Sequence, residues 1–564
     1  MKAIAQLAVL LAAVAVPGAA RSGAEAAAAE NAAPAAKQDA TIPKKPRVRV
    51  SISKETTYIT EPLRPDGYPD YIAALNQLAS KGVTPENNAA VLLWRALGGA
   101  SVHRVIRDRF FKMLGMPVPP EGGDYYLRLQ QHLQKTGLIP KPAEVEPGDE
   151  GLDQAYKQLD EAMKRPWRRE KFPALAGWLA ANEKPLALVV EAARRPRLYD
   201  PLLAVDESDM VLGVLLPGAQ AHRHLARPLQ ARAMLRLGQG KADAAWADLL
   251  ACHRLGRLSA QGPTLVQSLV GIAIESIACR GDEALLQHGR LSAGQVRAMR
   301  ADLDGLAPMP KMVDKIDLGE RFMYLDCVTM VARDGIDKLG RLNGGGGESG
   351  KVAKTLMNLA ARLTIDWDTI LRMGNSWYDR MVDAYRKPTR AERQKAFGAI
   401  DEDIKKLATE AKDFQSLALS ALGNPRKAIT RQMGKIFIAL LLPAVTAASQ
   451  AEDRGAMQFE VTRLGFALAA YRADHGAYPA KLSELTPKYV AEVPKDIFST
   501  EPLRYRRRGD GYLLYSVGVN GTDDGGRGYD DRERAGRWGD NDWDDLSVRV
   551  PADKKDKKPE GKKQ

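Results

Sequence analysis

The stretch LAAYRADHGAYPAKLSEL, residues 468–485, marks the point at which a long helical pattern stops. Around its start, apolar side chains recur at spacings of three and four residues, at Val461, Leu464, Leu468 and Tyr471. This spacing predicts a helix with one apolar face. Gly476 favours the left-handed conformation that often ends a helix, and Pro479 cannot continue one.

The residues that follow predict a small α+β module. The segment AKLSEL, residues 480–485, predicts a short second helix. The segment PLRYRRRGDGYLLYSVG, residues 502–518, alternates on both sides of Gly509-Asp510-Gly511, which is typical of a β-hairpin. We therefore expect a long helix, a short helix, a small antiparallel sheet and an acidic loop, in that order.

Four segments of this region resemble the type II secretion system protein G (major pseudopilin) family and the wider type IV pilin-like group. They are IALLLPAV (438–445), LAAYRADHGAYP (468–479), VPKDIFSTEPLRYR (493–506) and YSVGVNGTDDGG (515–526). In that family a long helix carries a globular head that begins at a Tyr-x-x-x-x-Gly-x-Tyr-Pro corner. This corner is matched here by Tyr471, Gly476, Tyr478 and Pro479. The resemblance implies a pseudopilin-like domain at residues 427–550.

The sequence also departs from this family. A pseudopilin starts with Gly-Phe-Thr-x-x-Glu, is cleaved there, and polymerises through an apolar half-helix that spans the membrane. Here the helix lies deep inside the chain, and no such cleavage motif precedes it. Its apolar run, residues 436–448, has about 13 residues against the roughly 20 needed to span a bilayer. We therefore expect no filament and no transmembrane helix in the mature chain.

In the family, the loop after Tyr-Ser-x-Gly often holds calcium, so the resemblance implies a calcium site in NGTDDGGRGYDD, residues 520–531. This segment also fits, imperfectly, the spacing of a twelve-residue calcium loop with Gly525 at its sharp turn. The oxygen ligands at places one, three, five and twelve are then Asn520, Thr522, Asp524 and Asp531. Calcium takes roughly six to eight oxygen ligands and relieves the repulsion between clustered carboxylates.

The alternative for this segment is a solvated acidic loop without a metal. Asp531 stands where a calcium loop usually has a bidentate Glu, and Arg527 and Arg532 are placed to neutralise the carboxylates. The segment GDNDWDD, residues 539–545, adds more carboxylates but lacks the glycine of a calcium loop.

The rest of the chain predicts a mainly α fold. Helical spacing of apolar residues continues through an irregular, helical-hairpin region at 47–426, with a flexible glycine-rich break near 343–351. Residues 219–261 resemble one tetratricopeptide hairpin, but no tandem copies follow at a fixed period. The apolar stripe of its second helix consists of Trp246, Leu249, Leu250 and His253.

The segment TLVQSLVGIAIESIAC, residues 264–279, is apolar nearly all round and predicts a buried helix. Glu275 interrupts it, either as a catalytic carboxylate or, as we favour, as a satisfied core carboxylate or one that points out of the core. The three cysteines, Cys252, Cys279 and Cys327, lie in apolar helical patterns and are expected to be small core residues. A single disulfide bridge between two of them remains an alternative.

The N-terminus predicts export. Residues 1–20 combine one Lys, a short apolar run and small residues at a cleavage site, as in a secretory signal peptide. Residues 21–46 form an Ala/Pro/Lys linker with too few apolar residues to order itself, and 551–564 form a basic tail. We expect a periplasmic or cell-envelope protein.

The net charge of +13 is scattered along the chain. This pattern favours a solvated surface over a nucleic-acid groove, and export makes a nucleic-acid partner less plausible still. The expected partners are other envelope proteins. Contact between the basic tail and an anionic surface is a further possibility.

No segment shows an established catalytic motif. GGGESGKV, residues 345–352, has Val352 where a phosphate loop needs Ser or Thr, so we interpret it as a glycine linker. The chain lacks His-Glu-x-x-His and Gly-x-Ser-x-Gly. We assign no enzymatic activity and expect a scaffold or partner-binding role. The alternatives are a secreted hydrolase with its active site in the helical region and an accessory component of a type II secretion or pilus-like system.

Overall fold

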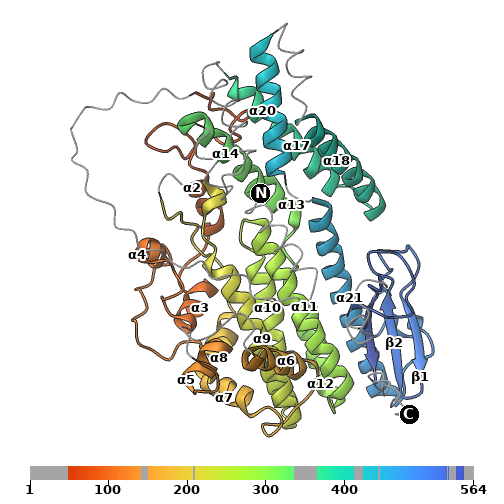
Figure 1. The fold of residues 1–564 in the computed structure, drawn as a ribbon. Coiled ribbons are helices and arrows are strands. Elements are labelled where there is room, and N and C mark those ends of the chain that lie inside the picture. The colour runs from red at the N-terminus through yellow and green to blue at the C-terminus, as the bar shows by residue number, and fades with distance from the viewer. Residues whose placement is uncertain are drawn as a thin grey trace, which may run out of the picture.

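The computed structural model describes residues 49–140, 150–206, 210–335, 365–411, 424–442, 445–529, 531 and 542–551. The predicted signal peptide, linker and glycine-rich break, and residues 552–564 of the predicted tail, lie outside these ranges. The described part is mainly helical and carries one small antiparallel sheet, which confirms a mainly α fold (Figure 1).

The first half of the described chain is helical. Its elements are α2 (Tyr71–Ser80), α3 (Ala89–Leu97), α4 (Arg104–Met113), α5 (Leu129–Lys135), α6 (Glu150–Lys164), α7 (Pro173–Ala181), α8 (Glu183–Ala192), η2 (Val211–Gly213), α9 (Pro217–Gly238), α10 (Ala242–Ser259) and α11 (Leu265–His288). The second half continues with α12 (Ala293–Asp304), α13 (Met312–Asp314), the π-helical turn η3 (Lys315–Glu320), α14 (Arg321–Asp334), α17 (Trp367–Tyr385), α18 (Arg390–Glu410), α20 (Pro425–Leu441), α21 (Val445–His475) and η4 (Leu482–Leu485).

Helices α9, α10 and α11 form the centre of the molecule (Figure 1). The predicted hairpin is present as α9 and α10, and Gly240 between them has φ +77°, which suits the turn. Helices α10 and α11 touch at their backbones. A Cβ added at Gly271 would lie 2.5 Å from the carbonyl oxygen of Gly256. The predicted stripe of α10, Glu275 and the three cysteines are all buried, and the cysteines are free thiols.

The residues before α2 form an arm without a strand in the described part of the segment. Asp70 caps α2 by accepting a hydrogen bond from the Ala73 amide. The arm is held by α17, because Nδ2 of Asn375 donates to the carbonyl oxygens of Glu55 and Thr56. Segments more than 300 residues apart are thereby joined.

One predicted helix is interrupted. The pattern from Lys435 to His475 predicts a continuous helix, whereas α20 ends at Leu441 and α21 begins at Val445. Leu442 has ψ 129° and is extended. It precedes Pro443 in the sequence, and a residue before proline is disfavoured in the α conformation. The expectation of one unbroken helix is wrong for this reason.

In the described part of the chain, one stretch has the length and apolar character of a membrane span. It is Arg426–His475, which includes both α20 and α21. Its apolar window has a mean hydropathy of 1.4, and 56% of that window is buried inside the protein.

The C-terminal elements pack against the central helices. Strands β1 (Arg504–Arg508), β2 (Gly511–Ser516) and β3 (Leu546–Val550) form an antiparallel sheet in the order β1-β2-β3. Arg508 pairs with Gly511, so the predicted hairpin is confirmed. Helix α21 lies between this sheet and α11 and α12, and its side chains share one hydrophobic core with the central helices (Figure 1).

The close approach of these layers depends on a small residue. A Cβ added at Gly465 of α21 would lie 3.1 Å from Leu286 of α11 and 3.2 Å from the hydroxyl of Tyr512 in β2. On the other side of the contact, Phe466 packs edge-on against Trp246 of α10, with ring centroids 5.5 Å apart. Helix α21 and the sheet are therefore packed directly against the helical region.

Candidate metal centre

Three carboxylates converge beside the sheet. Asp524 lies in the loop after β2, and Asp544 and Asp545 immediately precede β3. One oxygen from each of the three lies within 4.8 Å of the others. Because the loop follows β2 and the second segment leads into β3, the antiparallel pairing of these neighbouring strands brings the two segments to the same end of the sheet.

Backbone amides hold two of the carboxylates in place. Oδ2 of Asp544 accepts hydrogen bonds from the amides of Val519 and Asn520, at 2.9 and 3.1 Å. Oδ2 of Asp545 accepts one from the amide of Gly526, at 2.7 Å. Gly526 has φ +84°, a conformation that side chains disfavour, so this loop geometry requires glycine.

The other oxygens of the same two carboxylates have no protein partner. Oδ1 of Asp544 and Oδ1 of Asp545 are both buried without a hydrogen bond in the described part of the chain, and Asp545 is only 3% exposed. A buried acceptor left unpaired costs roughly 1–3 kcal/mol, and more when it is charged. These two unpaired oxygens make the cluster a candidate cation site.

The electrostatics of the cluster point the same way. Burial raises the pKa of Asp545 to about 7, although backbone hydrogen bonds from Gly526 and Asp524 oppose this, and the neighbouring negative charges of Asp524 and Asp523 add to the rise. Burial also raises the pKa of Asp544, although Arg454 opposes the shift. Nη1 of Arg454 lies 3.9 Å from Oδ2 of Asp544 and donates to the backbone oxygen of the same residue at 3.4 Å, so this ion pair is a long one. The raised pKa values mean that the ionised forms of Asp544 and Asp545 are disfavoured, and a bound cation would stabilise them.

The predicted ligands divide into two groups. Asp524 belongs to the cluster, and Asn520 lies beside it, because its Nδ2 is 3.5 Å from Oδ2 of Asp524. Oδ1 of Asn520 is occupied by the amide of Thr522, at 2.7 Å, and Thr522 is itself exposed. Asp531 is engaged elsewhere, since both of its oxygens accept from the guanidinium of Arg549, at 3.1 and 2.6 Å.

Arg527 does not neutralise the carboxylates as the metal-free alternative expects. Its guanidinium lies 4.4 Å from the ring centre of Trp543, and its Nε donates to the backbone oxygen of Asp524. Arg532 lies outside the described residues. Among the described residues, the three converging carboxylates come from two segments, whereas the predicted twelve-residue loop takes its ligands from one. The sequence did not indicate Asp544 and Asp545 as candidate ligands, because spacing within one loop cannot show that a second segment folds against it.

All three residues offer carboxylate oxygens, which are ligands for hard cations. Calcium accepts irregular arrangements of such oxygens, whereas magnesium demands a near-ideal octahedron and loses its water reluctantly. A cluster held by loop amides, with further oxygens available from backbone and water, fits calcium better.

A Ser-His-Asp chain bears on the hydrolase alternative. Oγ of Ser259 lies 3.2 Å from Nδ1 of His222, and Nε2 of His222 lies 3.6 Å from Oδ2 of Asp200. Asp200 also accepts a hydrogen bond from the indole of Trp94, at 2.7 Å. Ser259 and His222 are each 2% exposed, so a substrate cannot reach the hydroxyl in this conformation. We interpret these residues as part of the core, because only the Ser259–His222 contact of this chain is a hydrogen bond, and Nε2 of His222 and Oδ2 of Asp200 have no hydrogen-bond partner among the described residues.

Glu275 also has a structural role. Its two oxygens meet Nδ1 of His253, at 2.9 Å, and Nη1 of Arg257, at 2.5 Å. The interpretation of Glu275 as a satisfied core carboxylate is confirmed, since the residue is 2% exposed and fully paired.

Comparison of the chain with protein-family models, with curated proteins and with solved structures finds no match.

Proposed function

We propose that this protein is an exported, non-enzymatic scaffold of the cell envelope, whose C-terminal pseudopilin-like module binds one calcium ion through Asp524, Asp544 and Asp545. The observation that carries the proposal is the buried, unpartnered Oδ1 of Asp545, which lies in a cluster of three carboxylates. The order of α21, η4 and the antiparallel sheet supports the pseudopilin-like part, because it is the order that the resemblance implies.

Calcium in this position has a mechanical role. It ties the loop after β2 to the segment before β3, and β3 in turn contacts the central helices, since Glu283 of α11 accepts a hydrogen bond from the amide of Arg549. The ion therefore stabilises the packing of the sheet against the helical region. A rigid arrangement of this kind suits a protein that presents fixed surfaces to partners.

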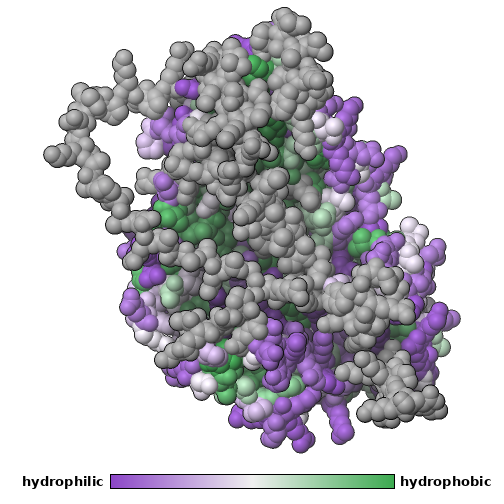
Figure 2. All heavy atoms as spheres, viewed as in Figure 1, coloured by the Kyte–Doolittle hydropathy of each residue, from purple (hydrophilic) through white to green (hydrophobic). Residues whose placement is uncertain are grey.

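The partners of this protein are proposed from the sequence. On the face drawn in Figure 2, hydrophilic side chains dominate the lower and right-hand edges of the molecule. We propose protein partners in the envelope, contact of the basic tail with an anionic surface, and no nucleic-acid partner.

Export is tested by sequencing the N-terminus of the native protein. A start near Arg21 in an envelope fraction supports it, and an intact Met1 in the cytosol contradicts it.

Calorimetric titration of the full chain with calcium tests the metal site. We expect one binding event for the unchanged protein and its loss in Asp545→Asn, because this change removes a ligand charge at the orphaned oxygen. Asp531→Asn is the matched control, since it removes the same charge from a residue paired with Arg549. Binding that survives Asp545→Asn but is lost in Asp531→Asn contradicts the proposed ligands and restores the twelve-residue loop.

A further inference from the structure

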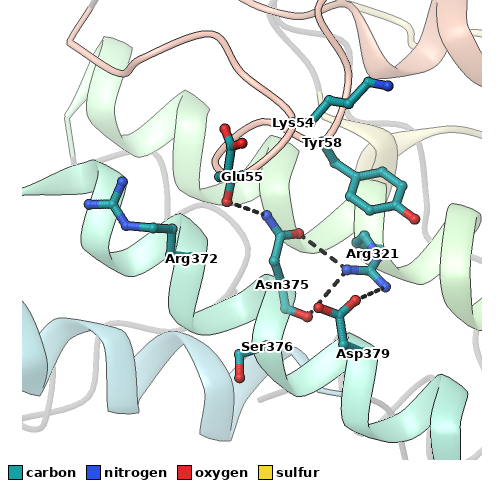
Figure 3. Close-up of a pocket in the computed structure, with 8 residues that line it drawn as sticks. All are labelled: Lys54, Glu55, Tyr58, Arg321, Arg372, Asn375, Ser376 and Asp379. Carbon is teal, nitrogen blue, oxygen red and sulfur yellow. Dashed lines mark hydrogen bonds and ion pairs between the residues drawn. The ribbon is translucent and has the colours of Figure 1, made fainter.

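A polar cavity of about 270 Å³ lies between the N-terminal arm and helix α17 (Figure 3). A water molecule occupies about 30 Å³ of liquid, so the cavity has room for a small organic molecule. Its volume is just below the roughly 300–1,000 Å³ of pockets for drug-sized ligands. The size alone points to a ligand no larger than a few amino-acid residues.

The wall of the cavity is fixed by Arg321, which is 1% exposed. Its five N–H groups are all used. Nε and Nη2 donate to Asp317, Nη1 donates twice to Asn375, and Nη2 also donates to Asp379. Arg321 therefore holds the wall together and has no donor left for a ligand.

The arm is fastened over this arginine by Tyr58. The tyrosine ring lies 4.3 Å from the guanidinium of Arg321, and its hydroxyl donates to Asp317 at 3.2 Å. Tyr58 has φ +63°, a strained conformation for a bulky residue. Such strain persists only where the surroundings hold it, and it often marks ligand sites.

Three groups that line the cavity remain unused. Within the described residues, no hydrogen bond or ion pair joins Lys54, Arg372 or Ser376 to another group, and Figure 3 shows no dashed line to any of the three. Arg372 and Ser376 are four residues apart on α17, so they lie on the same face of the helix. This end of the cavity offers positive charge and a hydroxyl to an anionic group.

The opposite end offers negative charge. Asp379 uses Oδ1 to accept from Arg321 and is 65% exposed, which leaves Oδ2 accessible. In Figure 3, Arg372 and Asp379 lie on opposite sides of Asn375. At a rise of about 1.5 Å per residue, seven residues of helix place them about 10 Å apart along its axis. A dipeptide spans about 7 Å when extended, and the two side chains can bridge the remainder.

The cavity lining carries charges of both signs. Its cations are Lys54, Arg321 and Arg372, and its carboxylates are Glu55 and Asp379. A purely anionic ligand would meet Glu55 and Asp379, and a purely cationic one would meet Lys54 and Arg372. A ligand that carries both charges can place its carboxylate at a cation of the lining and its ammonium group at a carboxylate.

We propose that this cavity binds a zwitterion of dipeptide size, with its carboxylate at Arg372 and Ser376 and its ammonium group at Asp379. The test is a calorimetric titration of the full chain with glycylglycine. N-acetylglycine, which keeps only the carboxylate, and glycinamide, which keeps only the ammonium group, are titrated in parallel.

We expect glycylglycine to bind and each single-charge compound to bind about tenfold more weakly or worse, because a charged hydrogen-bonding end is lost. Arg372→Ala should reduce glycylglycine binding by about tenfold or more on the same grounds. Arg386→Ala, at the C-terminal cap of α17 and outside the cavity lining, should leave binding unchanged. Glycylglycine that produces no heat at millimolar concentration overturns the proposal, and so does N-acetylglycine that binds as tightly as glycylglycine.

Discussion

Nε2 of His253 on α10 lies 2.8 Å from Oδ2 of Asp282 on α11, and both side chains are fully buried. The other ring nitrogen faces Glu275, so the imidazole is held between two carboxylates. Burial lowers the pKa of His253, but the two carboxylates outweigh it and raise that pKa to about 9. A charged histidine therefore joins α10 and α11 in the core.

The two carboxylates respond differently to the same imidazole. Burial raises the pKa of Glu275, but His253 and Arg257 outweigh burial and hold that pKa below its usual value. Burial prevails at Asp282 and raises its pKa although His253 opposes the shift, and the neighbouring charge of Glu275 adds to the rise. Phe459 of α21 covers the group, with its ring centre 4.6 Å from the guanidinium of Arg257. The cluster thus lies under the C-terminal helix.

The first prediction is a loss of stability in mild alkali. The folded-state pKa of His253 is raised from 6.5 to about 9, so its contribution is complete below pH 6.5 and falls as pH rises through about 9. At about 1.4 kcal/mol per pKa unit, the contribution is on the order of 3 kcal/mol. Chemical denaturation across this pH range should show that loss.

The variant His253→Gln should be less stable and should lack this pH-dependent component. Removing one partner from a buried ion pair costs about 3–5 kcal/mol, because a charge is left unpaired. His475→Gln, an exposed histidine at the end of α21, is the control and should keep the wild-type profile. A stability curve for His253→Gln parallel to that of the unchanged protein would show that His253 is neutral in the fold.

The second prediction concerns the backbone contact of α10 and α11. Gly271→Ala should destabilise the protein by about 1–3 kcal/mol, because the new methyl group meets the Gly256 carbonyl and Ala260. Gly398→Ala in α18 is the matched control, since no atom lies within 4 Å of the added Cβ. It should stabilise the protein by up to about 1 kcal/mol through helix propensity. Equal effects of the two changes would show that α10 and α11 are not in close contact.

The third prediction concerns the apolar face of α21. Leu468 is fully buried in the core shared with the central helices, so Leu468→Ala should cost about 2–5 kcal/mol. Leu78→Ala is the control, because Leu78 of α2 is 49% exposed and the same atoms are removed from a solvated position. Denaturation of the full chain measures both. A cost below about 0.5 kcal/mol for Leu468→Ala would mean that this face is not part of the core.

The sequence predicts local features well in this protein. Regular apolar spacing is enough to place α10, α11 and the C-terminal part of α21, and Gly509-Asp510-Gly511 is enough to place the hairpin. The break before α21 was missed because the apolar run continues across Pro443 and masks its effect on Leu442.

Contacts between distant segments could not be predicted in this way. The burial of Glu275 follows from the pattern of its own helix. Its partner His253 comes from another helix, and only the packing of the two helices determines that His253 faces Glu275. Asp544 and Asp545 meet Asp524 only because β2 and β3 pair. The arm likewise reaches α17 through Asn375, and no local pattern indicates that contact.

The most direct test of the central claim is thermal unfolding of the full chain with and without calcium. A bound ion stabilises the folded state by about 2.7 kcal/mol at a hundredfold excess over the dissociation constant. The melting temperature should therefore rise with calcium, rise less with magnesium, and fall with chelator. In Asp524→Asn combined with Asp545→Asn, calcium should have no effect. A melting curve of the unchanged protein that calcium does not move would contradict the account, and Asp524, Asp544 and Asp545 would then be an acidic cluster that holds no calcium.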